Sequence, residues 1–298
     1  WSPIGDITTI MLWVNNNVTT GALMTYLLVP SLTAVIVPLL FISFKLRGQL
    51  PAITAKDEDG VANFVSPKER SALFYLGVGG LIFVPIFKTV THLPPFVGML
   101  FVLGIIWIYT ELMYNKKALT NGPQNRLSRI LQRIDMPTIL FFLGILMAVA
   151  VLQATGILGS MADWLDEKVH NIYIINVLLG CISSIIDNVP LVAAAMGMYE
   201  IVPFDQVPDL LAASDIYRLN FVQDGGFWLL LSYCAGVGGS MLIIGSAAGV
   251  VVMGLEKMNF GWYLKHISWL ALLGYLAGAA ILIAELIMFP PIHTFHGF

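Results

Sequence analysis

The sequence predicts an all-α integral membrane protein that crosses the bilayer several times and contains a re-entrant hairpin and a broken helix. Composition is the first reason: 58% of the 298 residues are hydrophobic and 11% are charged, against about 45–50% and about 25% in soluble domains. The mean hydropathy is +0.84. The second reason is that apolar stretches of about 20 residues, long enough for a helix to cross a hydrocarbon core of about 30 Å, recur along the chain.

The apolar runs fall into two groups by length. Five of them, bounded by charged residues, have the length of ordinary spans: 24–46, 71–89, 95–114, 137–158 and 263–288. The segment 4–14 is too short to span, whereas 171–202 and 226–256 are long enough to make single helices of about 45 Å, which exceeds the bilayer core. We therefore expect 171–202 to be a re-entrant hairpin and 226–256 to cross once as a broken helix.

The positions of Lys and Arg predict the topology. They concentrate in loops at 45–70, 116–133 and 257–265, and only three of the 15 lie elsewhere. The positive-inside rule makes these loops cytoplasmic, which is consistent only if 171–202 enters and leaves on one face. Within the second loop, 126–134 predicts a short interfacial helix, with an ordinary solvated helix as the alternative. The net charge of -3 and the lack of a dense basic stripe exclude nucleic acid as a partner.

The middle of the hairpin carries the first candidate site. Asp187 and Asn188 are typical helix N-caps, so one helix can end and another begin here. Each arm then has about 15 residues and a length of about 22 Å, which places Asp187 within the membrane. A carboxylate at that depth costs about 2.5–3.5 kcal/mol and needs a compensating role. Asp187, Asn188 and Ser183 together offer carboxylate, amide and hydroxyl oxygens, which hard cations prefer, so we expect Asp187 and Asn188 to bind Na⁺. The alternative is that Asp187 only caps the second arm.

The broken helix carries the second candidate group. Its glycine-rich stretches, 236–240 and 245–249, permit a break whose freed carbonyl groups can coordinate sodium. Close packing between membrane helices through small residues is the alternative. The hydroxyl groups of Ser240 and Ser246, beside Gly239, favour a site.

The start of the chain resembles the broken helix at 226–256. Residues 4–6 (Ile-Gly-Asp) align with 244–246 (Ile-Gly-Ser), and the following spans are predicted to run in opposite directions, as inverted repeats require. On this interpretation Asp6, Thr8 and Thr9 form a second half-site; the alternative is that Asp6 only caps a helix. The fold class is then an inverted-repeat secondary transporter.

The expected domain organisation follows from the repeats. Residues 1–47 are the end of repeat one, 48–70 are a cytoplasmic loop, and 71–298 are repeat two. Because Trp1-Ser2-Pro3 has no basic n-region, the start is no signal peptide. We expect most of repeat one to precede Trp1.

The chain resembles the NhaD-type sodium/proton antiporters of the ion transporter superfamily, and specifically their C-terminal portion. The matching strings are 1–9 (WSPIGDITT), 87–96 (FKTVTHLPPF), 187–196 (DNVPLVAAAM) and 238–249 (GGSMLIIGSAAG). The resemblance implies exchange of Na⁺ or Li⁺ for H⁺ without a cofactor or an enzymatic reaction. It assigns Asp6, Thr8 and Thr9 to repeat one and Ser183, Asp187, Asn188 and Ser240 to repeat two. It also implies a multi-pass protein of the bacterial cytoplasmic membrane, with lipid, Na⁺ or Li⁺ and protons as partners and a homodimer left open.

Two other functions remain alternatives at this point. One is a sodium-coupled symporter of dicarboxylate-type anions from the same superfamily, although Asp187 at the hairpin tip would repel a substrate carboxylate. The other is an intramembrane aspartyl protease that uses Asp6 and Asp187 as a pair. Its usual signature resembles Gly-x-Gly-Asp with a Tyr-Asp partner, whereas this chain has Pro3 in place of the first glycine and Ile186 before Asp187.

Overall fold

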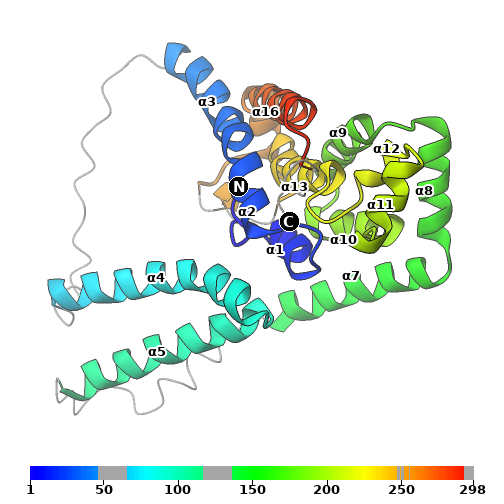
Figure 1. Ribbon diagram of the computed structural model, residues 1–298. Coiled ribbons are helices and arrows are strands. Elements are labelled where there is room, and N and C mark those ends of the chain that lie inside the picture. Colours follow the sequence, from blue (N-terminus) through cyan, green and yellow to red (C-terminus); the bar gives the residue numbers. More distant parts are fainter. Residues whose placement is uncertain (46–65, 117–135, 247–248, 250–251, 255, 292–298) are drawn as a thin grey trace. The chain divides into compact units, whose positions relative to one another are not determined.

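The computed structural model describes residues 1–45, 66–116, 136–246, 249, 252–254 and 256–291 (Figure 1). In this part of the chain the regular elements are helices, with one isolated parallel bridge between Val202 and Val222. The chain divides into two compact units, Gly48–Met136 and the combination of Trp1–Arg47 with Pro137–Phe298. The predicted interfacial helix at 126–134 and most of the loop 48–70 lie outside the described residues.

The smaller unit contains two packed membrane helices, α4 (Pro67–Thr91) and α5 (Pro95–Lys116). A capping box between Ser66 and Glu69 starts α4, and His92 ends it in a left-handed conformation. Gly80 of α4 lies directly against the side chain of Val102. Both helices are long and apolar enough to span a bilayer, in agreement with the spans expected at 71–89 and 95–114. The capping box explains why α4 begins before residue 71.

The larger unit holds the remaining elements. In chain order these are α1 (Ile7–Val14), α2 (Thr20–Tyr26), α3 (Leu28–Lys45), α7 (Met136–Ala154), α8 (Ile157–Lys168), α9 (Ile172–Ser183), α10 (Asn188–Met198), η1 (Phe204–Gln206), α11 (Val207–Ala212), α12 (Ile216–Leu219), α13 (Gly226–Gly238), η2 (Gly239–Met241), α15 (Phe260–His266) and α16 (Ser268–Met288). The core is formed where α9, α13 and α16 meet, and Trp228, Tyr275 and Leu282 are almost fully buried there.

Helices α3 and α16 lie side by side within this unit (Figure 1) and run antiparallel, because residues early in α3 meet residues late in α16. At one end the hydroxyl group of Tyr26 donates to the carbonyl oxygen of Phe289, 3.2 Å away. Further along, a methyl group added to Gly278 would lie 2.6 Å from the carbonyl oxygen of Pro30. The two backbones therefore approach as closely as small residues permit.

Two predicted spans differ from the structure. The run 137–158 was expected to be one straight span, but α7 ends at Ala154 and α8 begins at Ile157 after a bend of 70°. Gly156 between them has a left-handed backbone (φ 76°), which stops α7 and redirects the chain. The run 263–288 was expected to be continuous, but it divides at Ile267, and the span is Ser268–Met288.

The two segments of unusual length each contain an interruption. In 171–202, helices α9 and α10 are separated by residues 184–187. In 226–256, α13 ends at Gly238, one turn of 3-10 helix follows, and helical structure is lost over 242–246. Ile243 in this break has a left-handed backbone (φ 62°) although it is β-branched and buried, which costs on the order of 1–3 kcal/mol.

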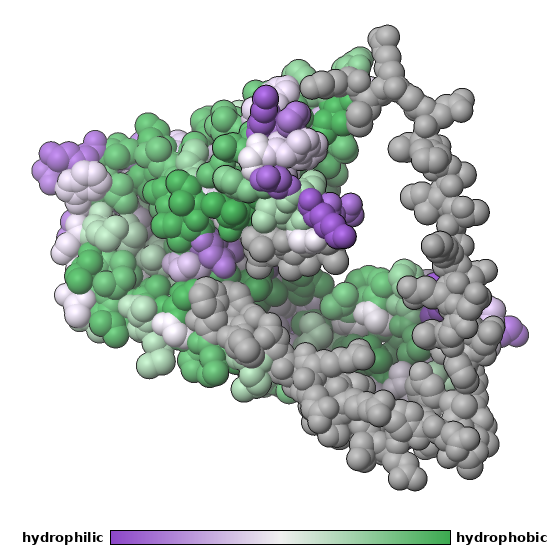
Figure 2. All heavy atoms as spheres, turned by 180° about the vertical axis from the view of Figure 1, so that it is seen from behind, coloured by the Kyte–Doolittle hydropathy of each residue, from purple (hydrophilic) through white to green (hydrophobic). Residues whose placement is uncertain are grey.

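The described helices identify a multi-pass membrane protein. Four of them are long and apolar enough to cross a membrane, Thr20–Phe44, Pro67–Thr91, Pro95–Met113 and Ser268–Met288, and the bent pair α7–α8 is a fifth candidate. Many of their large apolar side chains are exposed, and Figure 2 shows hydrophobic residues over most of the coloured surface on that face. Lipid is the solvent that such a surface requires.

Candidate cation site

Three helix ends that are distant in sequence meet around one carboxylate. Asp6 is the N-cap of α1, and its carboxylate accepts hydrogen bonds from the backbone N–H of Ile7 (2.8 Å) and the hydroxyl group of Thr8 (2.5 Å). The side-chain amide of Asn188, the first residue of α10, donates to Oδ2 of Asp6 at 3.2 Å. A methyl group on Gly236 of α13 would lie 3.5 Å from the same Oδ2. The α13 backbone is therefore in contact range of this carboxylate.

The surroundings of Asp6 are buried and polar. Thr8 is fully buried, 7% of Asn188 is exposed, and Asp6 itself is half-buried. Because an ionised carboxylate can only accept, the amide nitrogen of Asn188 faces Asp6. The amide oxygen of Asn188 is thus directed away from Asp6, so it can serve as a neutral ligand to a cation.

Asp187 lies one residue before Asn188, at the N-terminus of α10. Its Oδ1 accepts a hydrogen bond from the backbone N–H of Val189 at 3.1 Å, so it does cap the second arm. Among the described residues this is its one side-chain hydrogen bond, and the carboxylate is half-buried. Capping occupies only part of the acceptor capacity of a carboxylate, so capping and cation binding are compatible roles.

A second group of sequence-predicted residues gathers at the glycine-rich break. Ser183, at the end of α9, is fully buried and donates its hydroxyl hydrogen to the carbonyl oxygen of Ala235, 2.9 Å away. A methyl group on Gly239 would lie 2.6 Å from the carbonyl oxygen of Gly245 and 3.4 Å from Cβ of Ser246. Gly245 in turn lies directly against the carbonyl oxygen of Ser183. The break and the turn between α9 and α10 are therefore in contact.

The remaining candidates lie at the margin of these groups. Thr9 is buried and donates to the backbone oxygen of Asp6 at 2.9 Å, so it holds the first turn of α1. Ser240 is exposed, and its hydroxyl group donates to the carbonyl oxygen of Val237. The hydroxyl oxygen of Ser246 accepts from the backbone N–H of Gly249 at 3.4 Å. Ser240 thus stands apart from both groups.

A polar cavity of about 260 Å³ opens beside Asp6. Its lining includes three hydroxyl residues that the sequence did not single out, Ser31, Ser232 and Tyr233. The hydroxyl groups of Ser232 and Tyr233 donate to the backbone carbonyls of Trp228 and Tyr275. Isolated Ser and Tyr residues in apolar runs are common in membrane helices, so no sequence signal distinguished them. A cavity of this size is large enough for several water molecules beside Asp6.

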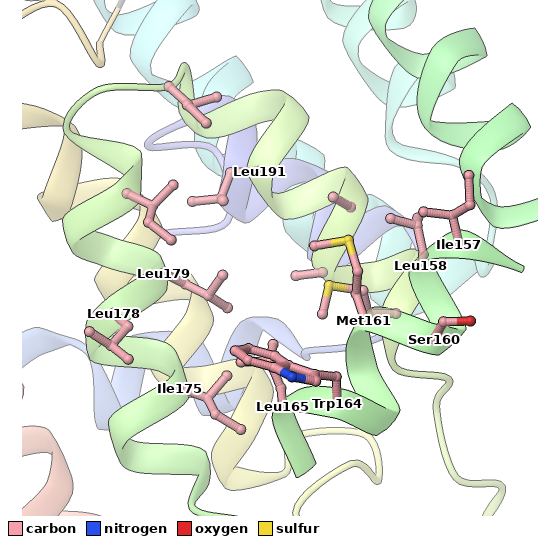
Figure 3. Close-up of a pocket in the computed structure, with 15 residues that line it drawn as sticks. Ile157, Leu158, Ser160, Met161, Trp164, Leu165, Ile175, Leu178, Leu179 and Leu191 are labelled. Carbon is pink, nitrogen blue, oxygen red and sulfur yellow. The ribbon is translucent and has the colours of Figure 1, made fainter. Parts of the chain in front are cut away.

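A larger cavity, about 690 Å³, lies between α8, α9 and α10. Figure 3 shows apolar side chains such as Leu179, Met161 and Trp164 around it, and Ser160 is the one hydroxyl residue in its lining. Such a lining offers no set of oxygen ligands for an ion. The polar cavity beside Asp6 is therefore the better candidate for the ion site.

Comparison with known proteins gives the family. The citrate transporter family (CitMHS) matches residues 1–216. Sodium/proton antiporters 1 and 2 of Arabidopsis thaliana are each 41% identical to this chain, over 284 and 278 residues, which cover 95% and 93% of it. The Na⁺/H⁺ antiporter NhaD of Alkalimonas amylolytica is 31% identical over 307 residues, covering 94% of this chain. The matches span only 46%, 62% and 57% of these three relatives.

No solved structure matches the chain significantly. The family is one of transporters, and this removes the aspartyl protease alternative. The chain therefore belongs to the citrate transporter family of membrane proteins, and its sequence relatives include NhaD-type sodium/proton antiporters.

Proposed function

We propose that this protein exchanges Na⁺ or Li⁺ for H⁺ across a membrane. The observation that carries the proposal is the meeting of Asp6, Asn188 and Gly236, because it brings carboxylate, amide and backbone groups from three helix ends together, beside a polar cavity that Asp6 and Gly236 line. Hard monovalent and divalent cations prefer such oxygen ligands. The names of the relatives, sodium/proton antiporters, agree with this chemistry.

Asp187 is our proposed coupling residue. A carboxylate can hold either a proton or a cation, and a bound cation favours its ionised form. Asn188 and Ser183, with the backbone carbonyls freed at 239–246, are the proposed neutral ligands. Because binding linkage is reciprocal, a cation that displaces a proton must bind more tightly as the pH rises.

Asp6 is the second proposed carboxylate of the site. It is the N-cap of α1, as Asp187 is the N-cap of α10. Asp6 also fixes the amide of Asn188 through the 3.2 Å hydrogen bond. On this proposal a cation bound near Asn188 is stabilised by two carboxylates of different helices, with Thr8 holding the orientation of Asp6.

The test is Asp187→Asn in the full-length protein, reconstituted into liposomes that contain a pH-sensitive dye. This substitution keeps size and hydrogen-bonding capacity but removes the titrating charge, so Na⁺-driven proton movement should be lost while the protein remains folded. Asp205→Asn, which alters an exposed carboxylate, is the matched control and should exchange normally. If Asp187→Asn exchanged Na⁺ for H⁺ with an unchanged pH profile, the coupling role would belong to another residue, Asp6 first.

The family description favours a second candidate, sodium-coupled transport of a carboxylate anion such as citrate. Two carboxylates at the proposed site oppose it, because they repel an anionic substrate. Proteoliposomes loaded for uptake distinguish the two functions: exchange predicts that neither citrate nor succinate is accumulated with Na⁺. Accumulation of either anion, with no Na⁺-driven proton movement, would select the symporter.

The membrane and the assembly stay predictions. The relatives come from a plant as well as from bacteria, so the bacterial cytoplasmic membrane is the expected location only for a bacterial source. The division into inverted repeats is supported by the antiparallel pairing of α3 with α16. A homodimer is left to measurement of the mass in detergent.

A further inference from the structure

A hydrogen-bonded clamp joins the turn between α1 and α2 to the loop between α12 and α13. The carboxylate of Asp224 accepts from the backbone N–H of Thr19 (2.6 Å) and from the hydroxyl group of Thr19 (2.8 Å). The backbone N–H of Asp224 donates to the carbonyl oxygen of Asn17 at 2.9 Å. We name Asn17, Thr19 and Asp224 the Asp224 clamp. It connects parts of the chain that lie 205 residues apart.

Both sides of the clamp are held rigidly. Asn16 and Asp224 each have a left-handed backbone (φ 60°), which Asn and Asp tolerate better than most residues. A methyl group on Gly225 would lie 2.7 Å from the carbonyl carbon of Asn220, so this loop is tightly folded. The backbone N–H of Phe227 also donates to Asn220 at 3.2 Å. The clamp is therefore a defined contact between two ordered turns.

Helices α1 and α13 connect the clamp to the candidate cation site. Helix α1 begins beside Asp6 and leads to Asn17, eleven positions later, while α13 begins after Asp224 and reaches Gly236 twelve positions later. The two helices are in contact. They run in opposite directions, because Thr19 meets Asp224 at one end and Asp6 meets Gly236 at the other. The two paths are thus of nearly equal length, and a shift at the clamp must appear as a shift between Asp6 and Gly236.

We propose that Asp224 is a positioning residue that sets Asp6 against Gly236 by fixing the far ends of α1 and α13. The assignment rests on the proposed function, because it concerns the same site. Thr19 already caps α2 by accepting from the backbone N–H of Ala22 at 3.3 Å, so local capping does not require Asp224. A carboxylate is needed because it accepts two hydrogen bonds from Thr19 at once.

Asp224 lies in surroundings where a charged carboxylate is energetically unfavourable, which supports a specific role for it. Burial raises the pKa of Asp224, and the hydrogen bonds from Thr19 oppose that rise. A neutral residue in place of Asp224 would avoid this penalty but would lose one of the two acceptors.

The first experiment measures geometry and does not depend on transport. Spin labels are placed at the exposed positions Ile7→Cys on α1 and Ser240→Cys in the turn that continues α13, with Cys181 and Cys234 replaced by Ala, and the distance distribution between them is recorded. Asp224→Ala should broaden this distribution. Asp205→Ala, the exposed control, should leave it unchanged. An identical, narrow distribution in Asp224→Ala would overturn the proposal.

The second experiment measures Na⁺-dependent exchange in proteoliposomes. Asp224→Ala should raise the KM for Na⁺ on the order of fivefold or more, the lower range of coupling between sites, with a smaller effect on kcat. Thr19→Val removes one hydrogen bond and should give an intermediate change, whereas Thr19→Ser keeps both donors and should restore the normal KM. Equal KM values in all variants would overturn the proposal. If the unaltered protein showed no exchange, the proposed function would fail, and the distance measurement would still decide the role of Asp224.

Discussion

Gly245→Ala tests the contact between the glycine-rich break and the turn that joins α9 to α10. Its added methyl group would lie 2.7 Å from the carbonyl carbon and oxygen of Ser184 and closer still to the carbonyl oxygen of Ser183. Ordinary contacts begin at about 3.4 Å, and backbone atoms cannot rotate away as a flexible side chain can. The turn must therefore move relative to the break.

Two opposing effects set the change in unfolding free energy that Gly245→Ala should cause. Overpacking against backbone costs about 1–3 kcal/mol. Replacing glycine by alanine also restricts the unfolded chain and so offsets about 0.4–1 kcal/mol of that cost. Gly245 does not have a left-handed backbone, so no conformational strain is added. The expected net loss of unfolding free energy is about 1.3 kcal/mol, the midpoint of a range from about 0 to about 2.6 kcal/mol.

The assay is reversible unfolding in detergent, with Na⁺ affinity measured on the same samples. Gly159→Ala in α8 is the matched control, because its methyl group would meet no heavy atom within 4 Å, and a helical glycine replaced by alanine gains about 0.5–1 kcal/mol. The two substitutions should thus change stability in opposite directions, and only Gly245→Ala should weaken Na⁺ binding. Unchanged stability and affinity in Gly245→Ala would refute the close contact.

Two further predictions concern the polar ends of the helices. Burial raises the folded pKa of Asp224 above its usual value of 3.8, so its favourable contribution is complete below that value and is lost as the pH rises through the folded pKa. The stability of the protein relative to Asp224→Asn should therefore fall as the pH rises above about 4, and a constant difference would contradict this. Tyr217→Phe removes the hydrogen bond from the Tyr217 hydroxyl to Asp166 and should cost about 1.5–3 kcal/mol, the range for a charged acceptor, in denaturant unfolding at pH 7. That cost should shrink in an Asp166→Asn background, and equal costs in both backgrounds would show that the pair is not coupled.

The spans could be predicted because each rests on a local property, apolar length between charges. Helices α4 and α5 match 71–89 and 95–114 for this reason. The bend between α7 and α8 could not be predicted in the same way, because the sequence around Gly156 is compatible with a continuing helix at a cost of about 1 kcal/mol. Only the left-handed backbone of Gly156 shows that the helix ends there.

The candidate site was predictable residue by residue but not as a geometry. Asp187, Asn188 and Asp6 could be named because polar groups in apolar segments are costly and rare. The hydrogen bond between Asn188 and Asp6 joins positions 182 residues apart, and no spacing in the sequence encodes it. The pairing of Asp224 with Thr19 was missed for the same reason, since an acidic residue in a polar loop is ordinary until its partner is known.

The contact between α3 and α16 has a consequence for how the protein responds to temperature. Gly274 lies directly against the carbonyl oxygen of Ala34, as Gly278 lies against that of Pro30. Between lipid-facing helices such contacts are driven by packing and by weak Cα–H···O interactions, not by release of water. Hydrophobic stabilisation weakens on cooling, whereas packing and Cα–H···O interactions between helices do not. The α3–α16 pair should therefore remain associated in the cold, when water-exposed turns of the same molecule begin to loosen.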